Sequence, residues 1–193
     1  MKKGTLVRNI IISAFVAELC LGAFLLSFLV NVNMNPGGSE IVFKNVIWGC
    51  QTVVADGQTH TIYELFNINS SGLAVVPALG LFMILFASIG CVLVAWLVKK
   101  PFAKWILLGL AVVILAGAIM QFFAYTAWLR ATVNESAKSQ GITDKAQIEE
   151  GYNEVKAMFD SYGAKAPMAI VVGVLGILGA LGVAIPKMIP EKE

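Results

Sequence analysis

Four stretches of this 193-residue sequence are long and apolar enough to cross a lipid bilayer. They lie at about 9–31, 73–98, 105–129 and 168–185. The hydrocarbon core of a bilayer is about 30 Å thick, and a helix needs about 20 mostly apolar residues to cross it. Backbone amides inside lipid must be hydrogen-bonded within the chain, so each stretch is predicted to be a helix. The sequence therefore predicts an all-α integral membrane protein in which 1–193 form a single domain, a bundle of four transmembrane helices.

The composition favours the same interpretation. Hydrophobic residues make up 58% of the chain and charged residues 13%, whereas a soluble domain has about 25% charged residues. A soluble domain of this size cannot bury so much apolar surface, because about a third of its unfolded-chain surface stays exposed. The net charge of +2 is too small to indicate binding to nucleic acid. The lipid bilayer is therefore the expected surrounding.

The distribution of lysine and arginine predicts the orientation of the spans. Basic residues gather beside both chain ends and fill the short connection at 99–104, which reads K-K-P-F-A-K. The two long loops, 32–72 and 130–167, carry most of the acidic residues. Cytoplasmic loops are enriched in lysine and arginine. We therefore expect a multi-pass protein of the cell membrane with both termini in the cytoplasm and both long loops outside, where they form a cap.

The first outer loop is predicted to form a small antiparallel sheet. Asp56-Gly57 is a typical two-residue hairpin turn, because a type I′ turn needs positive φ at both central positions. The segments 50–55 and 58–65 on either side are rich in β-branched residues and are predicted to be strands, with a further strand at 40–48. An isolated hairpin is marginally stable in water. This sheet is therefore expected to pack on the second outer loop or on a partner.

The second outer loop is predicted to contain an amphipathic helix. The helix is expected to begin after Gly141, with Thr143 as its N-cap, and to end at Gly163. Its apolar positions recur at spacings of four, three and four: Ile148, Tyr152, Val155 and Phe159. Such spacing places these side chains on one face of a helix. This face could cover the sheet of the first loop, dock another protein, or do both.

Glu18 is the only charged residue of the first span. It lies about 14 Å into the span at 1.5 Å per residue, where a carboxylate costs at least about 2.5 kcal/mol and is a functional candidate. The four spans contain no lysine, arginine or histidine, and Ser88 of the second span is expected at a similar depth. We therefore expect Glu18 to face the bundle interior, protonated or hydrogen-bonded to Ser88 or to a backbone carbonyl. Three roles remain open: a polar clasp, an ion or proton path, and a contact with a basic helix of a partner.

The fourth span contains a stripe of glycines at every third position: Gly173, Gly176, Gly179 and Gly182. Small residues allow helix backbones to approach closely in lipid, where no hydrophobic effect drives helices together. Because three residues advance about 300° around a helix, the stripe winds slowly and should meet more than one neighbour. Tight packing inside the bundle is the first interpretation, and oligomerisation is the alternative.

The order of segments, with Trp48-Gly49-Cys50 in the first outer loop, resembles the claudin-like tetraspan family. In that family the loop carries two cysteines joined by a disulfide, whereas Cys50 is the only cysteine outside the spans here. The thiol of Cys50 is expected to be buried or to cross-link two chains. The resemblance implies adhesion or an accessory role beside another membrane protein. Trp48, Cys50, Tyr152 and Phe159 are the candidates for contacts between the cap and a partner.

No catalytic motif is present in the sequence. It contains no H-E-x-x-H, no G-x-S-x-G and no Walker loop, and a lone His60 cannot form a metal site. We therefore expect a protein without enzymatic activity, cofactor or metal. The favoured function is an accessory, scaffold or adhesion protein that binds another membrane protein or a second copy through its outer loops. The alternative is a small transporter or channel subunit with Glu18 in an ion or proton path.

Overall fold

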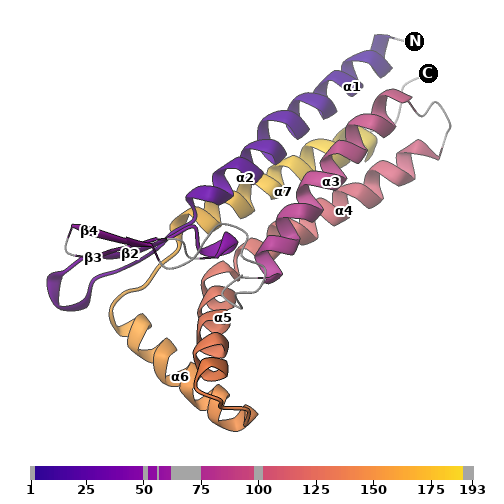
Figure 1. Cartoon of the computed structure of the whole chain (residues 1–193). Coiled ribbons are helices and arrows are strands. Elements are labelled where there is room, and N and C mark those ends of the chain that lie inside the picture. The colour runs from indigo at the N-terminus through magenta and orange to yellow at the C-terminus, as the bar shows by residue number, and fades with distance from the viewer. Residues whose placement is uncertain (1–2, 50–51, 56, 62–74, 98–101, 189–193) are drawn as a thin grey trace. The chain divides into compact units, whose positions relative to one another are not determined.

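A computed structural model of the chain describes residues 3–49, 52–55, 57–61, 75–97 and 102–188. These residues are mostly helical and include one small antiparallel sheet (Figure 1). They belong to two compact units. The first, called the helical unit, comprises Met1–Leu26, Leu79–Gln121 and Val171–Glu193. The second, called the cap, comprises Ser27–Ala78 and Phe122–Ile170.

Four helices of the described residues are long and apolar enough to cross a membrane, as the sequence predicts: Gly4–Leu29, Val75–Leu97, Ala103–Gln121 and Pro167–Ile185. The first consists of α1 (Lys3–Phe15), the π-helical turn η1 (Val16–Cys20), α2 (Leu21–Leu26) and the 3₁₀ turn η2 (Ser27–Leu29). The others are α3 (Val75–Leu97), α4 (Ala103–Gln121) and α7 (Pro167–Met188). Within the helical unit, α1 begins and α7 ends at the same end, where α3 also ends and α4 begins (Figure 1).

The third of these helices is shorter than the sequence predicts. The prediction ended it at Leu129, but α4 ends at Gln121, and a turn at Phe122 and Phe123 separates it from α5 (Ala124–Ser139). Trp128 therefore belongs to the cap, where it is buried. The prediction failed because the apolar residues continue without interruption across the turn, so hydropathy marks no boundary there.

The sheet of the cap is a meander of four antiparallel strands, in the order β1-β2-β3-β4: Val32–Met34, Ile41–Lys44, Thr52–Ala55 and Gln58–Thr61. The predicted hairpin is confirmed, since Ala55 pairs with Gln58 across the two-residue turn and Gly57 has φ +75°. The part of the predicted strand beyond Thr61 lies outside the described residues.

The strand predicted over 40–48 is shorter in the structure. β2 ends at Lys44, and Val46–Trp48 form a 3₁₀ turn, η4. Between them Asn45 adopts a left-handed conformation with φ +60°, and its backbone N–H donates to the Asn31 side-chain oxygen at 3.2 Å. Asparagine tolerates this conformation better than most residues do, so the chain leaves the sheet at this residue.

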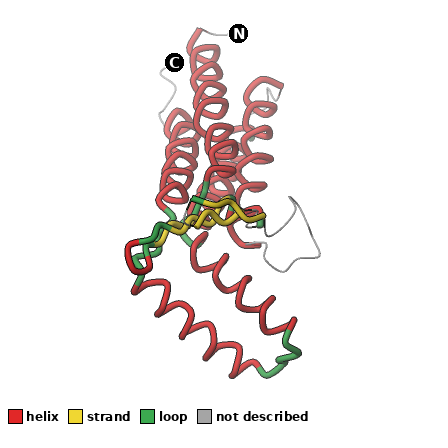
Figure 2. Tube along the Cα trace, turned by 60° about the vertical axis from the view of Figure 1, so that its left-hand side comes forward, coloured by secondary structure: helices red, strands yellow, loops and turns green. Residues whose placement is uncertain are grey.

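The second outer loop contributes two helices to the cap and also extends its sheet. α5 and α6 (Lys145–Ser161) are antiparallel and joined by a short turn at Gly141, which has φ +73° (Figures 1 and 2). The N-cap of α6 is Asp144 rather than the predicted Thr143, because the Asp144 carboxylate accepts from the Ala146 N–H at 3.0 Å. After α6, Lys165 and Asn33 exchange two backbone hydrogen bonds of 2.9 and 3.0 Å. The first loop therefore packs on the second.

Candidate interaction sites

Glu18 is exposed, which corrects the prediction that it faces the bundle interior. It lies in η1, where the Leu21 N–H bonds to the Val16 carbonyl five residues earlier. Val16 and Cys20 are buried, and Glu18 is two residues from each, about 200° around the helix. Among the residues that the structure describes, none forms a hydrogen bond or an ion pair with Glu18. The prediction was wrong because the depth of Glu18 does not give its direction, and the signal for the inward side, the pair Asn9 and Ser13, was not used.

Ser88, the expected partner of Glu18, is buried on α3. Its hydroxyl donates to the backbone carbonyl of Leu85 in the same helix at 2.7 Å. A serine that bonds to its own helix is a common way to satisfy a hydroxyl in an apolar environment. The structure therefore does not bring Glu18 and Ser88 together as one polar site.

The glycine stripe of α7 contacts two neighbours within the helical unit. A Cβ atom added to Gly176 would lie 2.7 Å from the Cβ of Ala118 in α4. On Gly179 it would collide with the Sγ of Cys20, and on Gly182 with the Phe15 ring. The remaining member, Gly173, is also buried. These contacts lie within one chain and agree with tight packing inside the bundle.

Two polar contacts between α1 and α3 were not predicted. The buried Asn9 side chain donates from Nδ2 to the carbonyl of Ala95 at 2.6 Å. One turn further on, the Trp96 indole donates from Nε1 to the Ser13 hydroxyl at 2.7 Å. The available signal was the pair Asn9 and Ser13, four residues apart on one helix side in an apolar span.

The candidate contact residues of the first outer loop differ in accessibility. Trp48 is buried, its indole donates to the Ser27 hydroxyl at 2.9 Å, and its ring stacks on Phe28 at a centroid distance of 5.1 Å. A side chain placed in this way is part of the cap's own core rather than of a surface for a partner. Cys50 lies outside the described residues.

The candidate contact residues of α6 pack within the cap. The Phe159 ring lies 5.9 Å from Phe43 of β2 and 6.0 Å from Trp128 of α5, and Phe43 and Trp128 are 4.9 Å apart. The guanidinium of Arg130 lies over the ring of Tyr152, 4.7 Å from the centroid of that ring. Arg130 also forms an ion pair with Glu149 at 2.5 Å. Phe159 therefore reaches the sheet through Phe43. The rest of the predicted apolar face meets α5, a helix that the sequence did not predict.

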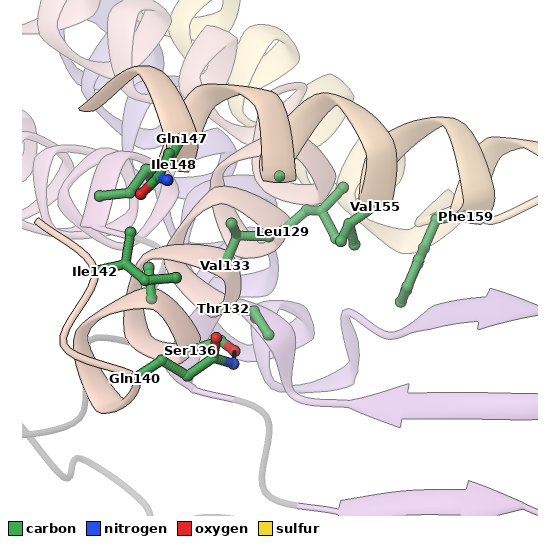
Figure 3. Close-up of a pocket in the computed structure, with 12 residues that line it drawn as sticks. Leu129, Thr132, Val133, Ser136, Gln140, Ile142, Gln147, Ile148, Val155 and Phe159 are labelled. Atoms are coloured by element: carbon green, nitrogen blue, oxygen red, sulfur yellow. Dashed lines mark hydrogen bonds between the residues drawn. The ribbon is translucent and has the colours of Figure 1, made fainter. Parts of the chain in front are cut away.

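A groove of about 320 Å³ lies between α5 and α6 (Figure 3). Its apolar lining comes from both helices, and the polar members gather near the turn that joins them. The lining residues are Leu129, Thr132, Val133, Ser136, Ala137, Gln140, Ile142, Gln147, Ile148, Gly151, Val155 and Phe159. Volumes of 300–1,000 Å³ with mostly apolar walls and a few polar groups are typical of binding pockets. This groove therefore has the size and lining to receive a ligand or a partner's side chains.

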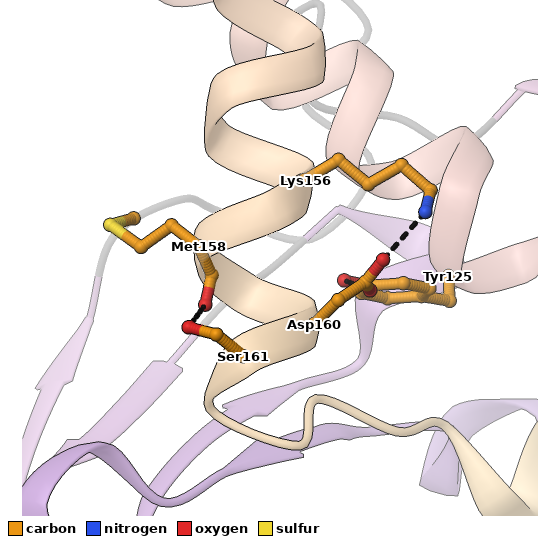
Figure 4. A network of polar contacts seen from close by, with 5 residues as sticks. All are labelled: Tyr125, Lys156, Met158, Asp160 and Ser161. Atoms are coloured by element: carbon orange, nitrogen blue, oxygen red, sulfur yellow. Dashed lines mark hydrogen bonds and ion pairs between the residues drawn. The ribbon is translucent and has the colours of Figure 1, made fainter.

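A small polar network joins α5 to the end of α6 (Figure 4). Asp160 accepts from the Tyr125 hydroxyl at 2.9 Å and from the Lys156 ammonium at 2.6 Å. The hydrogen bonds from Lys156 and Tyr125 lower the pKa of Asp160. Hydrogen bonding to Asp160 raises the pKa of Lys156, whereas burial, followed by the bond to Asp160, raises the pKa of Tyr125. The network is largely exposed, so it fastens one edge of the helix pair rather than forming a catalytic site.

A comparison of this chain with known protein families and with curated proteins finds no match. Its function is therefore argued from the residues and contacts described above.

Proposed function

We propose that this chain is a multi-pass protein of the cell membrane, without catalytic activity, that acts as an accessory or scaffold subunit or as an adhesion protein. It binds another membrane protein or a second copy through the cap. In this proposal the helical unit spans the bilayer with both termini in the cytoplasm, and the cap lies outside.

The membrane part of the proposal is supported by the surface of the helical unit. Large apolar side chains on three different helices are highly exposed: Phe86 at 65%, Trp105 at 70% and Val112 at 65% on α3 and α4, with Ile185 at 51% on α7. Monomeric soluble proteins rarely expose contiguous apolar surfaces on this scale. Within the helical unit, α3 ends and α4 begins at the end where α1 begins (Figure 1). The sequence between these two helices is rich in lysine at 99–104, which favours that end as the cytoplasmic one.

The observation that carries the binding role is the groove between α5 and α6. Its walls include Leu129, which is fully buried, and Val133 and Val155, which are half-buried and line the open groove. A groove between two antiparallel helices accepts the apolar face of a third helix or a row of large side chains. Adhesion and accessory subunits need a surface of this kind.

The groove can be tested by filling it. Gly151 of α6 lines the groove, and a Cβ atom added to it would meet no atom within 4 Å, so Gly151→Phe is chosen to fill the groove from this helix. Ala157, six residues further on, is exposed and lies about 240° around the helix, so Ala157→Phe is the matched control. The tagged chain is purified from its native membrane in mild detergent, and the mass of the intact complex is measured.

The proposal expects the wild-type chain and Ala157→Phe to retain a stoichiometric second protein or a second copy, and Gly151→Phe to lose about nine tenths of it. A monomer in all three preparations would contradict the binding role. Retention of the partner by Gly151→Phe would show that binding does not use the groove.

The alternative function, a transporter or channel subunit with Glu18 in its path, receives less support. Glu18 is exposed and lies about 200° from the inward-facing Val16. An exposed carboxylate favours a contact surface over a path through this chain's own bundle.

A further inference from the structure

We propose that the exposed face of the first span around Glu18 is a docking surface for a transmembrane helix of another protein that carries an arginine or lysine near the middle of the bilayer. This inference goes beyond the cap, because the contact lies inside the membrane. It rests on the proposal that the four helices span a bilayer, and it does not depend on the groove between α5 and α6.

The first argument is the depth of Glu18. The span runs from Gly4 to Leu29, and Glu18 lies eleven residues before its end. At 1.5 Å per residue this places the carboxylate about 16 Å from that end, close to the middle of a hydrocarbon core about 30 Å thick. A glutamate side chain is too short to reach the headgroups from there. The charged form of this carboxyl group therefore needs a partner within the membrane.

The second argument is the backbone at this position. Glu18 is the central residue of η1, a single π-helical turn between α1 and α2. Such turns are rare and occur mainly at functional sites. Within this turn Val16 and Cys20 are buried and Glu18 is exposed.

The third argument is the small side chains beside Glu18. Ala14, Glu18 and Gly22 follow one another at intervals of four along one side of the helix, and Ala17 next to Glu18 is also exposed. A Cβ atom on Gly22 would meet no atom within 4 Å, in contrast to the crowded glycines of α7. Nothing in the described chain therefore requires glycine at this position, and the open space would let another helix approach closely.

Charge complementarity identifies the occupant. A second copy would bring no cation to this depth, because the only basic residues in the first span and in α3, α4 and α7 lie close to helix ends: Lys3, Arg8, Lys104 and Lys187. A second copy would instead place another carboxylate against Glu18. An arginine or lysine on a different helix supplies the opposite charge and several hydrogen-bond donors. Ionisable residues inside membranes pair with one another in this way.

The experiment uses the full chain in phosphatidylcholine vesicles together with synthetic leucine-alanine peptides of about 24 residues. One peptide has a central arginine, one has no charge, and one has a central glutamate that represents a second copy. Energy transfer between a dye on the cap and a dye on the peptide reports binding. Insertion of the chain is checked first by flotation and alkaline extraction, so a failure of the membrane proposal is separated from a failure of docking.

The arginine peptide is expected to bind about tenfold more tightly than the uncharged peptide. Glu18→Gln, which retains hydrogen bonding but removes the charge, should abolish this difference, and Gly22→Ile should weaken binding severalfold. Equal binding of all three peptides to the inserted chain would overturn the proposal, as would strongest binding of the glutamate peptide. The control variant is Leu178→Glu in the Glu18→Gln background, since Leu178 is an exposed residue of α7. Full recovery of binding in this variant would show that any exposed carboxylate suffices. It would contradict the proposal that docking uses the face of the first span around Glu18.

Discussion

The helical unit and the cap differ in the residues that pack inside each of them: small residues in the helical unit and large aromatic residues in the cap. In the helical unit, α3 and α4 cross at two glycines: a Cβ atom on Gly80 would lie 2.6 Å from the Gly117 carbonyl oxygen, and one on Gly117 would collide with the Gly80 carbonyl oxygen. In the cap, the elements meet at the large rings of Phe43, Trp128 and Phe159, with centroids 4.9–6.0 Å apart. Helix backbones therefore touch in the helical unit, whereas aromatic side chains separate the backbones in the cap.

This difference follows from the solvent that each unit is proposed to face. In water, burial of aromatic rings stabilises a fold by removing apolar surface from the solvent. In lipid that gain is lost, and close contact between backbones becomes the main source of packing energy. The helical unit accordingly exposes apolar side chains such as Trp105, whereas the cap exposes charged ones such as Glu149. The predictions below change one kind of contact at a time.

The largest effect is expected from removing the aromatic centre of the cap. Trp128 is 2% exposed, and Trp128→Ala should destabilise the cap by about 3–5 kcal/mol. Hydrogen exchange measured by mass spectrometry should then show lost protection of α5, α6 and the sheet, with α4 unchanged. Trp105→Ala, at the exposed end of α4, is the control and should change nothing in the cap. Wild-type protection of α5 in Trp128→Ala would refute the aromatic core.

A smaller effect is expected at the glycine crossing of the helical unit. Gly117→Ala places a methyl group against the Gly80 carbonyl oxygen, a backbone atom that cannot rotate away, and should cost about 1–3 kcal/mol. Gly109 lies on the same helix with no atom within 4 Å of an added Cβ, so Gly109→Ala should be tolerated. Thermal unfolding in detergent would compare the two variants. Similar midpoints would mean that the close crossing is not required.

The polar contacts between α1 and α3 should contribute less to the stability of the helical unit than the glycine crossing does. Asn9→Leu removes the bond to the Ala95 carbonyl, and hydrogen bonds between membrane helices average about 0.6 kcal/mol. The unfolding midpoint of the helical unit should therefore fall slightly, while hydrogen exchange in the cap stays constant. A loss as large as that of Gly117→Ala would contradict the view that close backbone packing dominates this unit.

The smallest effect is expected at the exposed network of the cap. Tyr125→Phe removes the hydroxyl that donates to Asp160 and should cost about 0.5 kcal/mol, because the network is solvated.

The loss of stability caused by Tyr125→Phe should also depend on pH. The pKa of Asp160 is lowered in the folded cap, so its contribution is present above the unfolded value of about 3.9 and is lost as the pH falls through the folded value. The pKa values of Tyr125 and Lys156 are raised, so their contribution is complete below about pH 10 and is lost at higher pH. The stability advantage of the wild type over Tyr125→Phe should therefore shrink as the pH falls below about 4 and as it rises above about 10. A constant difference from pH 2 to 12 would show that the hydroxyl acts independently of these charges.

The length of the apolar stretches and the residues of one turn were sufficient to predict part of the fold. Four apolar stretches predict four long helices, and Asp56-Gly57 predicts the hairpin that joins β3 to β4. The boundary between α4 and α5 was missed, because Phe122 and Phe123 continue the apolar run through the turn. Without α5, the groove and the main packing surface of α6 could not be predicted either.

The direction in which Glu18 points could not be predicted from the sequence either. The sequence identifies Glu18 as unusual, but the few other polar residues of the span, such as Asn9 and Ser13, mark one side too weakly to fix its orientation. Its outward position depends on which side of the helix meets the glycines of α7. That is decided by close contacts such as Cys20 against Gly179, which spacing along a single chain does not specify.

The four helices are proposed to cross a membrane and to leave the cap outside. Single cysteines at Lys138, exposed in the last turn of α5, and at Lys104, exposed in the first turn of α4, test this proposal most directly in a variant without native cysteines. Intact cells are treated with a maleimide that cannot cross membranes. We expect labelling of Lys138→Cys in intact cells and of Lys104→Cys only after the cells are opened. Labelling of Lys104→Cys in intact cells, with or without Lys138→Cys, would contradict this proposal.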